Sequence, residues 1–300
     1  MIHLKKFFLR SPVSEEDFMN TIKRTCYDSY YPFLFFPNQK ELSEVIFSDI
    51  TIFCGSNGSG KSTLLNVIAE KMELKRETAY NKTDFFNPYL TGCHYELNEC
   101  NVENQREMMK VSRIITSDDV FKHILGVREK NEKISFKREI LFEEKRIMNR
   151  FGWQGPRSID IENPESVNAF MDYHQKFKLS ASKYVRRNAI VDERTFSNGE
   201  NGFRYFTDAI QPGELYLLDE PENSLSAEMQ IELANYIHAM ARFYNCQFVI
   251  STHSPFILCL PYAKIYNMDL TPVTTCKWTE LSNMKIYYGF FKEHSLEFEV

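Results

Sequence analysis

Residues 55–63 read Gly-Ser-Asn-Gly-Ser-Gly-Lys-Ser-Thr and contain the spacing G-x-x-x-x-G-K-S. Glycines at this spacing allow backbone conformations closed to other residues, so that successive N–H groups can point at phosphate oxygens. Lys61 would reach the β- and γ-phosphates of a nucleotide, and the Ser62 hydroxyl would bind magnesium. The predicted phosphate-binding residues are Gly55, Ser56, Asn57, Gly58, Ser59, Gly60, Lys61, Ser62 and Thr63.

Such a loop needs a strand before it and a helix after it, and both patterns are present. Residues 49–54 form an apolar, β-branched run that predicts a strand, and residues 63–71 have apolar side chains at helical spacing. The positive end of that helix would face the same phosphate group. A chance glycine-rich turn is the alternative, and the complete motif between these flanks argues against it.

Two carboxylates follow the apolar run Leu215–Leu218, which predicts a fully buried parallel strand. Asp219 lies at the carboxyl end of this strand, where open α/β sheets bind ligands, and we expect it to bind magnesium directly or through water. Glu220 would orient or deprotonate the attacking water as a general base. Alternatively, these carboxylates could belong to an ordinary solvated turn after a strand. The phosphate loop in the same chain argues against this interpretation.

A histidine follows another predicted strand, over residues 247–251. His253 could donate a hydrogen bond to a γ-phosphate or to the attacking water. A surface histidine without a role is the alternative, but its place one strand after the two carboxylates favours a function. The predicted catalytic residues are Lys61, Glu220 and His253.

Residues 196–200 read Phe-Ser-Asn-Gly-Glu. Ser197 and Glu200 fit the capping box S-x-x-E, so that residues 201–210 would form an amphipathic helix. Gly199 and Gly202 lie at the start of this predicted helix, and glycine has a low helix propensity. A helix N-terminus with a glycine and a serine hydroxyl is also an anion site, so this segment could face a second γ-phosphate.

Together these motifs resemble the ABC ATPase superfamily, in which this signature segment of one subunit closes over ATP held by its partner. More narrowly, the chain resembles the small stand-alone bacterial AAA/ABC-like ATPases that are not transporters, whose signature reads Ser-His/Asn-Gly-Glu. The similarity extends from the N-terminus through Lys292 and is weakest between about 75 and 195. The segments that carry it are residues 196–200, 216–223, 225–226 and 251–255.

The resemblance implies ATP and Mg²⁺ as cofactors and a homodimer that forms on ATP binding. It implies that Ser197, Asn198, Gly199 and Glu200 contact ATP in trans, and that Ser62 and Asp219 hold the metal. The usual glutamine between the lobes is absent. Residues 115–121 occupy the matching place, where Asp118 could sense magnesium or water, although Ser117 and Asp118 also fit helix N-cap preferences. Candidates for stacking on adenine are Tyr31, Phe33 and Phe36.

The expected fold class is α/β, a P-loop NTPase of the ABC-ATPase type with a mixed central sheet, an antiparallel edge and an inserted helical lobe. A single domain over 1–300 would have a nucleotide-binding lobe from 1–116 and 196–300, and a helical lobe from 117–195. Short strands are expected at residues 264–268 and 273–276, followed by a terminal helix from Thr279.

Composition limits the remaining choices. The 300 residues are 43% hydrophobic, which is ample for one sizeable core, and they contain no uncharged apolar run of 18 residues that would span a membrane. The first ten residues are too short and too charged for a secretory signal and predict a strand instead. Seven irregularly spaced cysteines indicate reduced thiols and a cytoplasmic location.

The net charge of −5 is unevenly distributed. Residues 117–195 contain 16 basic and 13 acidic residues, whereas the rest of the chain contains 20 and 28. A solvated helical lobe with alternating charges is the plain interpretation. The alternative is a docking face for nucleic acid or an acidic partner.

The predicted activity is magnesium-dependent ATP hydrolysis, and the process that it drives stays open. One hypothesis is a DNA-linked or phage-defence ATPase that acts with a separate effector protein. The alternative is the ATPase subunit of a membrane ABC transporter, which the unusual signature and the missing glutamine make less favourable. A small-molecule kinase would leave the signature unexplained.

Overall fold

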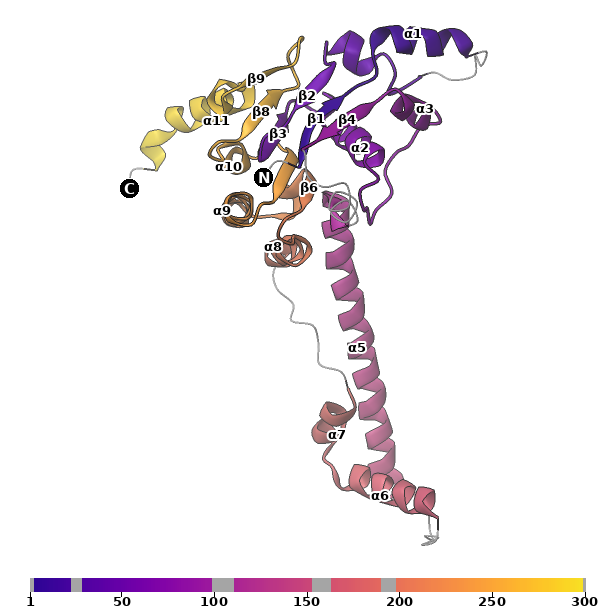
Figure 1. Ribbon diagram of the computed structural model, residues 1–300. Helices are drawn as coiled ribbons and strands as arrows, with labels where there is room; N and C mark the ends of the chain where they lie inside the picture. The colour runs from indigo at the N-terminus through magenta and orange to yellow at the C-terminus, as the bar shows by residue number, and fades with distance from the viewer. Residues whose placement is uncertain (1–2, 23–28, 99–110, 153–162, 190–197, 299–300) are drawn as a thin grey trace. The chain divides into compact units, whose positions relative to one another are not determined.

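The computed structural model describes residues 3–22, 29–98, 111–152, 163–189 and 198–298. The chain divides into two compact units, the first comprising Met1–Phe121 and Asn198–Val300 and the second Lys122–Ser197. In the described residues, both β-sheets belong to the first unit, and the second unit is helical (Figure 1). The lobe boundaries at residues 117 and 195 stay a prediction.

The described part of the first unit contains a sheet of six strands in the order β5-β6-β7-β3-β8-β9. These strands are β3 (Ile50–Cys54), β5 (Arg113–Thr116), β6 (Leu215–Asp219), β7 (Gln247–Ser251), β8 (Lys264–Asn267) and β9 (Thr274–Cys276). All neighbours pair in parallel except β9, which pairs antiparallel with β8 at the edge. The expected mixed α/β sheet with an antiparallel edge is therefore confirmed. Strands β3 and β7 are buried along their whole length, which accounts for their continuous apolar runs.

A second, antiparallel sheet in the described residues has the order β2-β1-β4. Its strands are β1 (Leu4–Phe8), β2 (Glu44–Ile46) and β4 (His94–Leu97). The strand predicted in the first ten residues is thus confirmed as β1. It pairs with β2 and β4 and not with the edge of the main sheet, where β9 provides the antiparallel strand.

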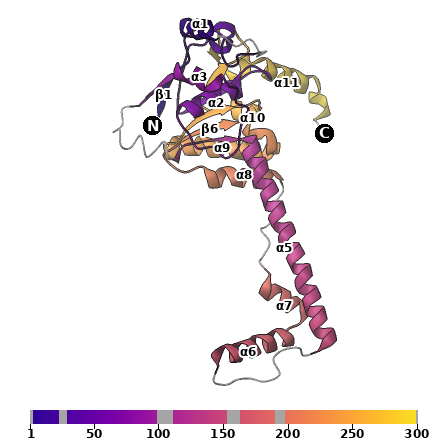
Figure 2. The ribbon, with the colours of Figure 1, turned by 90° about the vertical axis from the view of Figure 1, so that its right-hand side faces the viewer.

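Helices cover both faces of the main sheet. Figures 1 and 2 show α2 on one face and α8 and α9 on the other. Among the described residues, the α-helices that lie wholly in the first unit are α1 (Pro12–Thr21), α2 (Lys61–Lys71), α3 (Phe86–Thr91), α8 (Asn198–Ala209), α9 (Ala227–Phe243), α10 (Pro255–Leu258) and α11 (Ser282–Glu293). Single turns of other helix types are η1 (Phe35–Gln39), η2 (Pro221–Ser224), η3 (Trp278–Glu280) and η4 (Ser295–Glu297). The strands and terminal helix expected after residue 264 occur as β8, β9 and α11.

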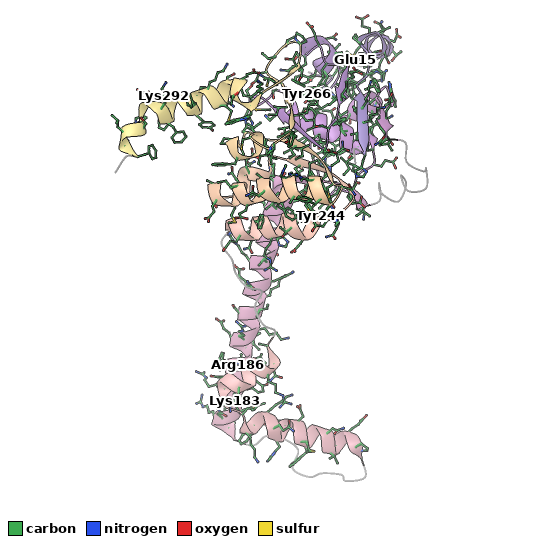
Figure 3. The ribbon with its side chains drawn as sticks, turned by 60° about the vertical axis from the view of Figure 1, so that its left-hand side comes forward. Glu15, Lys183, Arg186, Tyr244, Tyr266 and Lys292 are labelled. Atoms are coloured by element: carbon green, nitrogen blue, oxygen red, sulfur yellow. The ribbon has the colours of Figure 1, made fainter. Side chains whose placement is uncertain are left out.

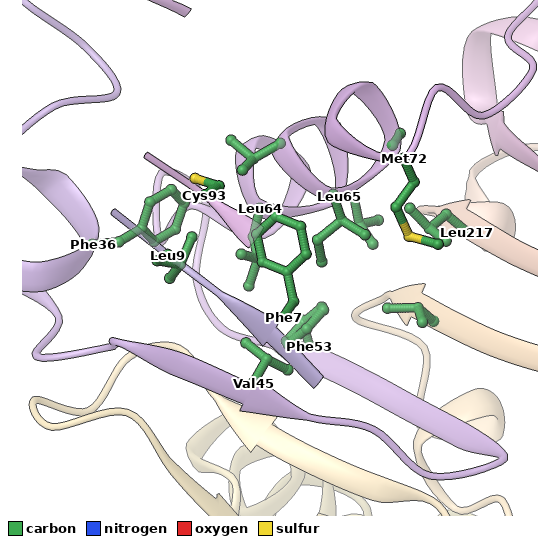
Figure 4. Packing of buried hydrophobic residues seen from close by; sticks show 14 of the residues in the cluster. Phe7, Leu9, Phe36, Val45, Phe53, Leu64, Leu65, Met72, Cys93 and Leu217 are labelled. Carbon is green, nitrogen blue, oxygen red and sulfur yellow. The ribbon is translucent and has the colours of Figure 1, made fainter. Parts of the chain in front are cut away.

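The core of the first unit surrounds α2. Leu64 and Leu65 of this helix are fully buried against Phe7 of β1, Phe53 of β3 and Leu217 of β6, within one cluster (Figure 4). Burial of each such side chain contributes about 1.5–3 kcal/mol. This packing fixes the first residue of α2 at the end of β3, where the phosphate-binding loop must lie.

The second unit is built from most of α5 (Ser117–Phe151), α6 (Pro164–Lys178) and α7 (Ala181–Asn188). Its described core is small and contains Leu141, Tyr184 and Val185. Lys145 is buried among these helices and donates from Nζ to the carbonyl oxygens of Lys176 and Phe177, at 3.0 and 2.7 Å. A cation at the last carbonyls of α6 stabilises that helix end.

Candidate nucleotide-binding site

The loop between β3 and α2 adopts a conformation that requires glycine. Gly58 and Gly60 have φ angles of 82° and 96°, in the left-handed region that residues with a Cβ atom avoid. A Cβ atom at Gly60 would also collide with the ring of Phe35. The glycines that the sequence motif contains at these positions are therefore needed for the path of the loop and for its close contact with another segment.

Lys61 begins α2 and is only 4% exposed. Its Nζ atom donates to the carbonyl oxygens of Gly55 and Ser56, at 2.7 and 3.1 Å. Burial lowers the pKa of Lys61, and the nearby carboxylates of Glu220 and Asp219 oppose that shift. The ammonium group thus lies inside the loop, where it can exchange carbonyl oxygens for those of a phosphate group.

The two motifs that are farthest apart in the sequence meet at Ser62 and Asp219. The Ser62 hydroxyl donates to Oδ1 of Asp219 at 2.9 Å. Burial raises the pKa of Asp219, and the Ser62 hydrogen bond opposes this effect. A hydroxyl and a carboxylate oxygen are hard ligands of the kind that Mg²⁺ prefers, so this pair fits the metal that the family implies.

Glu220 and His253 lie together at the ends of β6 and β7. The Glu220 N–H donates to the Ser251 carbonyl at 2.9 Å, and Glu220 has a left-handed φ of 48°, a conformation that costs about 1–2 kcal/mol. Its Oε1 is 3.9 Å from Nε2 of His253, and its Oε2 accepts from Asn223 Nδ2 at 2.9 Å. Burial and then Lys61 lower the pKa of His253, which favours a neutral imidazole at pH 7.

The backbone of His253 is held by Glu222, a residue to which the sequence alone assigns no role. Oε1 of Glu222 accepts hydrogen bonds from the N–H groups of His253 and Ser254, at 2.6 and 3.2 Å. Burial raises the pKa of Glu222, and the His253 N–H opposes that shift. The sequence does offer one indication of this role, because Glu222 lies two residues after the predicted base Glu220. An acidic side chain just after a strand can reach the loop that follows the neighbouring strand.

In the described structure, a pocket of about 340 Å³ lies between the phosphate loop, Tyr31 and Glu220. It is lined by Tyr31, Asn57, Gly58, Gly60, Lys61, Ser62, Thr63 and Glu220. Tyr31, whose hydroxyl is hydrogen-bonded to Oγ1 of Thr63, is one of the three aromatic candidates for adenine stacking. The other two, Phe33 and Phe36, are buried in the core instead.

Asp269 is a further contact of the phosphate loop that sequence motifs do not indicate. It follows β8, and its Oδ1 accepts from the N–H and the hydroxyl of Ser56, at 2.8 and 2.7 Å. The sequence separation of 213 residues hides this pairing from any local pattern. Ser56 is therefore anchored from the β8 side of the sheet.

Arg76, which belongs to none of the sequence motifs, is half-buried near the same strand ends. Its guanidinium lies 4.3 Å from the centre of the Tyr80 ring. The pKa of Arg76 is lowered by burial and raised by nearby groups, among them Asp119 and Asp219. A cation in this position adds positive potential beside the predicted metal ligands.

The predicted signature lies only partly within the described residues. Ser197 lies outside them, and Asn198 is the first residue of α8. Gly199 and Glu200 follow in the first turn of that helix. A Cβ atom at Gly199 would lie 3.5 Å from the Ser226 nitrogen, so the start of α8 packs closely on the loop that follows η2.

At the position of the missing glutamine, the side chain that points inward belongs to Asp119. Asp118 is exposed, whereas Asp119 is 1% exposed. Oδ2 of Asp119 accepts from the N–H and the hydroxyl of Thr116, at 2.7 and 3.0 Å, which caps the start of α5. The metal-sensing role predicted for Asp118 stays a prediction.

The phosphate loop between β3 and α2, together with carboxylates at the end of β6, a parallel strand of the same sheet two positions from β3, defines a P-loop NTPase. Residues 45–223 match the family model described as ABC transporter, and residues 200–258 match that of the AAA ATPase domain. The first match covers more than half of the sequence, and the chain therefore belongs to the ABC family. It is an ATP-binding ATP hydrolase, as the predicted resemblance implied.

Solved structures of similar proteins include two SMC head domains and one ATP-binding cassette. The SMC head domain of Thermotoga maritima is 16% identical, with 92% of this chain and 98% of that one covered and a TM-score of 0.39. The Smc head of Pyrococcus furiosus, bound to the C-terminal domain of ScpA, is 14% identical, with coverages of 82% and 94% and a TM-score of 0.38. A dimeric ATP-binding cassette with ADP and Pi is 14% identical, with coverages of 78% and 88% and a TM-score of 0.35. No curated protein matches the chain.

Proposed function

We propose that the pocket binds ATP with magnesium, that two copies of this chain pair in the cytoplasm when ATP is bound, and that they separate after hydrolysis. The observation that carries this proposal is the 2.9 Å hydrogen bond between Ser62 and Asp219, which links the phosphate loop to the strand that bears the predicted base. The loop amides of residues 55–63 and Lys61 would hold the phosphates.

Different residues of the chain would bind the metal, accept the proton of water and hydrogen-bond the phosphate during hydrolysis. Ser62 and Asp219 would hold Mg²⁺, which when bound neutralises charge on the phosphate oxygens. Glu220 would accept the proton of the attacking water, since its carboxylate lines the pocket. Neutral His253, 3.9 Å from Glu220, would donate a hydrogen bond to the γ-phosphate or to that water.

The second part of the proposal concerns the partner copy. The signature residues Ser197, Asn198, Gly199 and Glu200 would close over the ATP of the other subunit. Support comes from Gly199 and Glu200, which lie in the first turn of a helix of 12 residues, whose N–H groups and positive end attract a γ-phosphate. Residues of both copies would then meet on one nucleotide, so dimerisation would depend on ATP.

The third part concerns what hydrolysis drives. We propose a DNA-related or phage-defence role with a separate effector protein, in which the helical segment 117–195 contacts nucleic acid. Exposed basic side chains on α7, including Lys183 and Arg186, support this proposal (Figure 3). No helix in the described ranges is long and apolar enough to cross a membrane.

Glu220→Gln tests the proposed base and the dimer together. The variant should lose hydrolysis by about 100-fold or more, the contribution typical of a general base, and should accumulate an ATP-dependent dimer. Glu228→Gln, an exposed carboxylate in the first turn of α9, is the matched control and should behave as wild type. Steady-state phosphate release and size-exclusion chromatography with light scattering measure both effects. Wild-type turnover without an ATP-dependent dimer would overturn the proposal.

The nucleic-acid contact has a separate test. Double-stranded DNA should stimulate ATP hydrolysis, with an effect that declines steeply as salt rises. Lys183→Glu with Arg186→Glu should remove the stimulation and leave the basal rate unchanged. Stimulation by a membrane partner alone would instead favour the transporter alternative.

A further inference from the structure

Helix α1 buries a carboxylate where an amphipathic surface helix would bury an apolar side chain. Glu15 is fully buried, and it is the buried residue of α1 (Figure 3). Its Oε2 accepts a hydrogen bond from the Leu34 N–H at 2.7 Å, and in the described structure Oε1 has no hydrogen-bond partner. A buried carboxylate has lost its hydration, and the Leu34 N–H and the nearby charge of Arg10 offset part of that cost.

The partner of Glu15 has an unfavourable backbone conformation. Leu34 has a φ of 65° and a ψ of 0°, in the left-handed region where a Cβ atom clashes with the following carbonyl. Leu34 is 37% exposed, so its own packing holds this conformation only in part. The hydrogen bond to Glu15 therefore restrains the backbone of Leu34 directly, beside the buried rings of Phe33 and Phe36 in the same segment.

This turn directs two aromatic rings toward the phosphate loop. Phe35, the next residue, packs so closely on Gly60 that a Cβ atom there would collide with its ring. Tyr31 hydrogen-bonds Thr63 and lines the pocket, and its ring packs edge-on against Phe35 at 5.6 Å between centroids. A shift of the Leu34 backbone would move both rings relative to the loop.

We propose that Glu15 is a positioning residue for nucleotide binding, whose buried carboxylate holds Tyr31 and Phe35 against the phosphate loop. The proposal rests on the function proposed above, because it assumes that ATP occupies this pocket. Glu15 does not line the pocket and would act through Leu34. The contacts of Tyr31 and Phe35 are with Gly60 and Thr63, so the effect should fall on binding more than on the chemical step.

Glu15→Ala removes the hydrogen bond and should raise the KM for ATP about tenfold, which corresponds to about 1.4 kcal/mol. The kcat at saturating ATP should stay within about twofold, because Glu220 and His253 keep their contacts. Glu15→Gln keeps an acceptor oxygen for the Leu34 N–H and should restore the KM to within about twofold of wild type. Isothermal titration with a non-hydrolysable ATP analogue should give the same order of affinities.

Ser11→Ala is the control for general damage to α1. It removes the N-cap acceptor of the same helix, at 3.3 Å from the Ser14 N–H, and leaves Glu15 in place. The loss of an N-cap residue typically destabilises a helix by about 1 kcal/mol. The KM for ATP should nevertheless stay at the wild-type value. An equal KM rise in Ser11→Ala, or no KM rise in a folded Glu15→Ala protein, would overturn the positioning role.

Lys61→Ala separates this inference from the proposed function. If Lys61→Ala binds the analogue as tightly as wild type, the pocket is not the ATP site and the proposed function fails. If Lys61→Ala loses binding while Glu15→Ala keeps the wild-type KM, only the role of Glu15 is wrong. Thermal unfolding of each variant verifies that the proteins compared are folded.

Discussion

Two groups of residues, called here the acidic wall and the aromatic wall, lie at the pocket, which Glu220 and Tyr31 line directly. The two groups are held in place by different means. The acidic wall, formed by Asp219, Glu220 and His253, lies at the ends of the parallel strands β6 and β7. The aromatic wall, formed by Tyr31 and Phe35, lies on a segment before β2 that has no strand or α-helix of its own. One wall is supported by the sheet, whereas the other depends on a few long-range contacts.

This difference predicts that the two walls affect different kinetic constants. Asp219 is opposite Ser251 in the parallel register, and the Glu220 N–H continues the ladder to the Ser251 carbonyl. The sheet therefore holds the backbone of Asp219 and Glu220, while Glu222 holds that of His253. The aromatic wall is restrained by the Glu15–Leu34 hydrogen bond and by Lys40, whose Nζ donates to the Met268 carbonyl at 2.7 Å. We expect changes in the acidic wall to alter kcat and changes in the aromatic wall to alter KM.

Among the variants that test how each wall is positioned, the largest effect is expected at Glu222. Glu222→Ala removes the acceptor of the His253 and Ser254 N–H groups and should let His253 move. We expect kcat to fall about 10- to 100-fold with little change in KM, because a displacement of about 1 Å at a catalytic group can cost about 100-fold. Steady-state kinetics over a range of ATP concentrations separate the two constants.

Glu222→Gln is the matched variant, since it keeps an acceptor oxygen for both N–H groups. Its kcat should lie much closer to wild type than that of Glu222→Ala. If the two variants lose activity equally, the charge of Glu222 matters and its hydrogen bonds do not, and the acidic wall is not positioned as inferred.

The two walls also differ in how far the sequence predicts them. Strand β3, the loop and α2 follow from local patterns. The placement of Ser62 and Asp219 at the same edge of the sheet also follows, because both motifs come at the carboxyl ends of parallel strands. Their direct contact does not follow from the sequence, since β7 lies between β3 and β6. The Glu15–Leu34 and Asp269–Ser56 contacts depend on tertiary packing between segments without a shared motif. The choice between Tyr31, Phe33 and Phe36 likewise needed burial, because aromatic residues fill cores and line pockets alike.

Asp118 and Asp119 illustrate the same limit at the scale of one residue. Successive residues at the start of a helix point about 100° apart, so a shift of one position exchanges an exposed side chain for a buried one. The sequence predicts that an acidic residue follows β5, but it does not predict which of the two is buried. That depends on the exact start of α5 at Ser117, which turns Asp119 inward.

A smaller effect is expected from the aromatic wall. Tyr31→Ala should raise the KM for ATP about 5- to 10-fold with kcat nearly unchanged, in line with the contribution of about 1 kcal/mol from one aromatic contact. Tyr31→Phe keeps the ring, loses the hydrogen bond to Thr63 and should raise KM by less. A fall in kcat without a change in KM would show that the two walls do not divide binding from chemistry.

The smallest expected effect is a pH dependence of stability that belongs to the acidic wall. Burial and Lys61 lower the pKa of His253 below its ordinary value of 6.5, against the opposing carboxylates of Glu220 and Asp269. Below pH 6.5 the unfolded chain therefore binds a proton that the folded chain does not, so the free energy of unfolding should decrease as pH falls until the folded-state pKa is reached.

His253→Gln lacks this titration, so the difference in unfolding free energy between wild type and variant should decrease as pH falls from about 7 to 5, across the ordinary histidine pKa. Urea denaturation at several pH values in this range measures it. A difference that increases toward low pH would mean that Glu220 dominates and that the folded protein favours a charged imidazole. His253 would then meet the γ-phosphate as a cation, and its contribution to the acidic wall would be electrostatic.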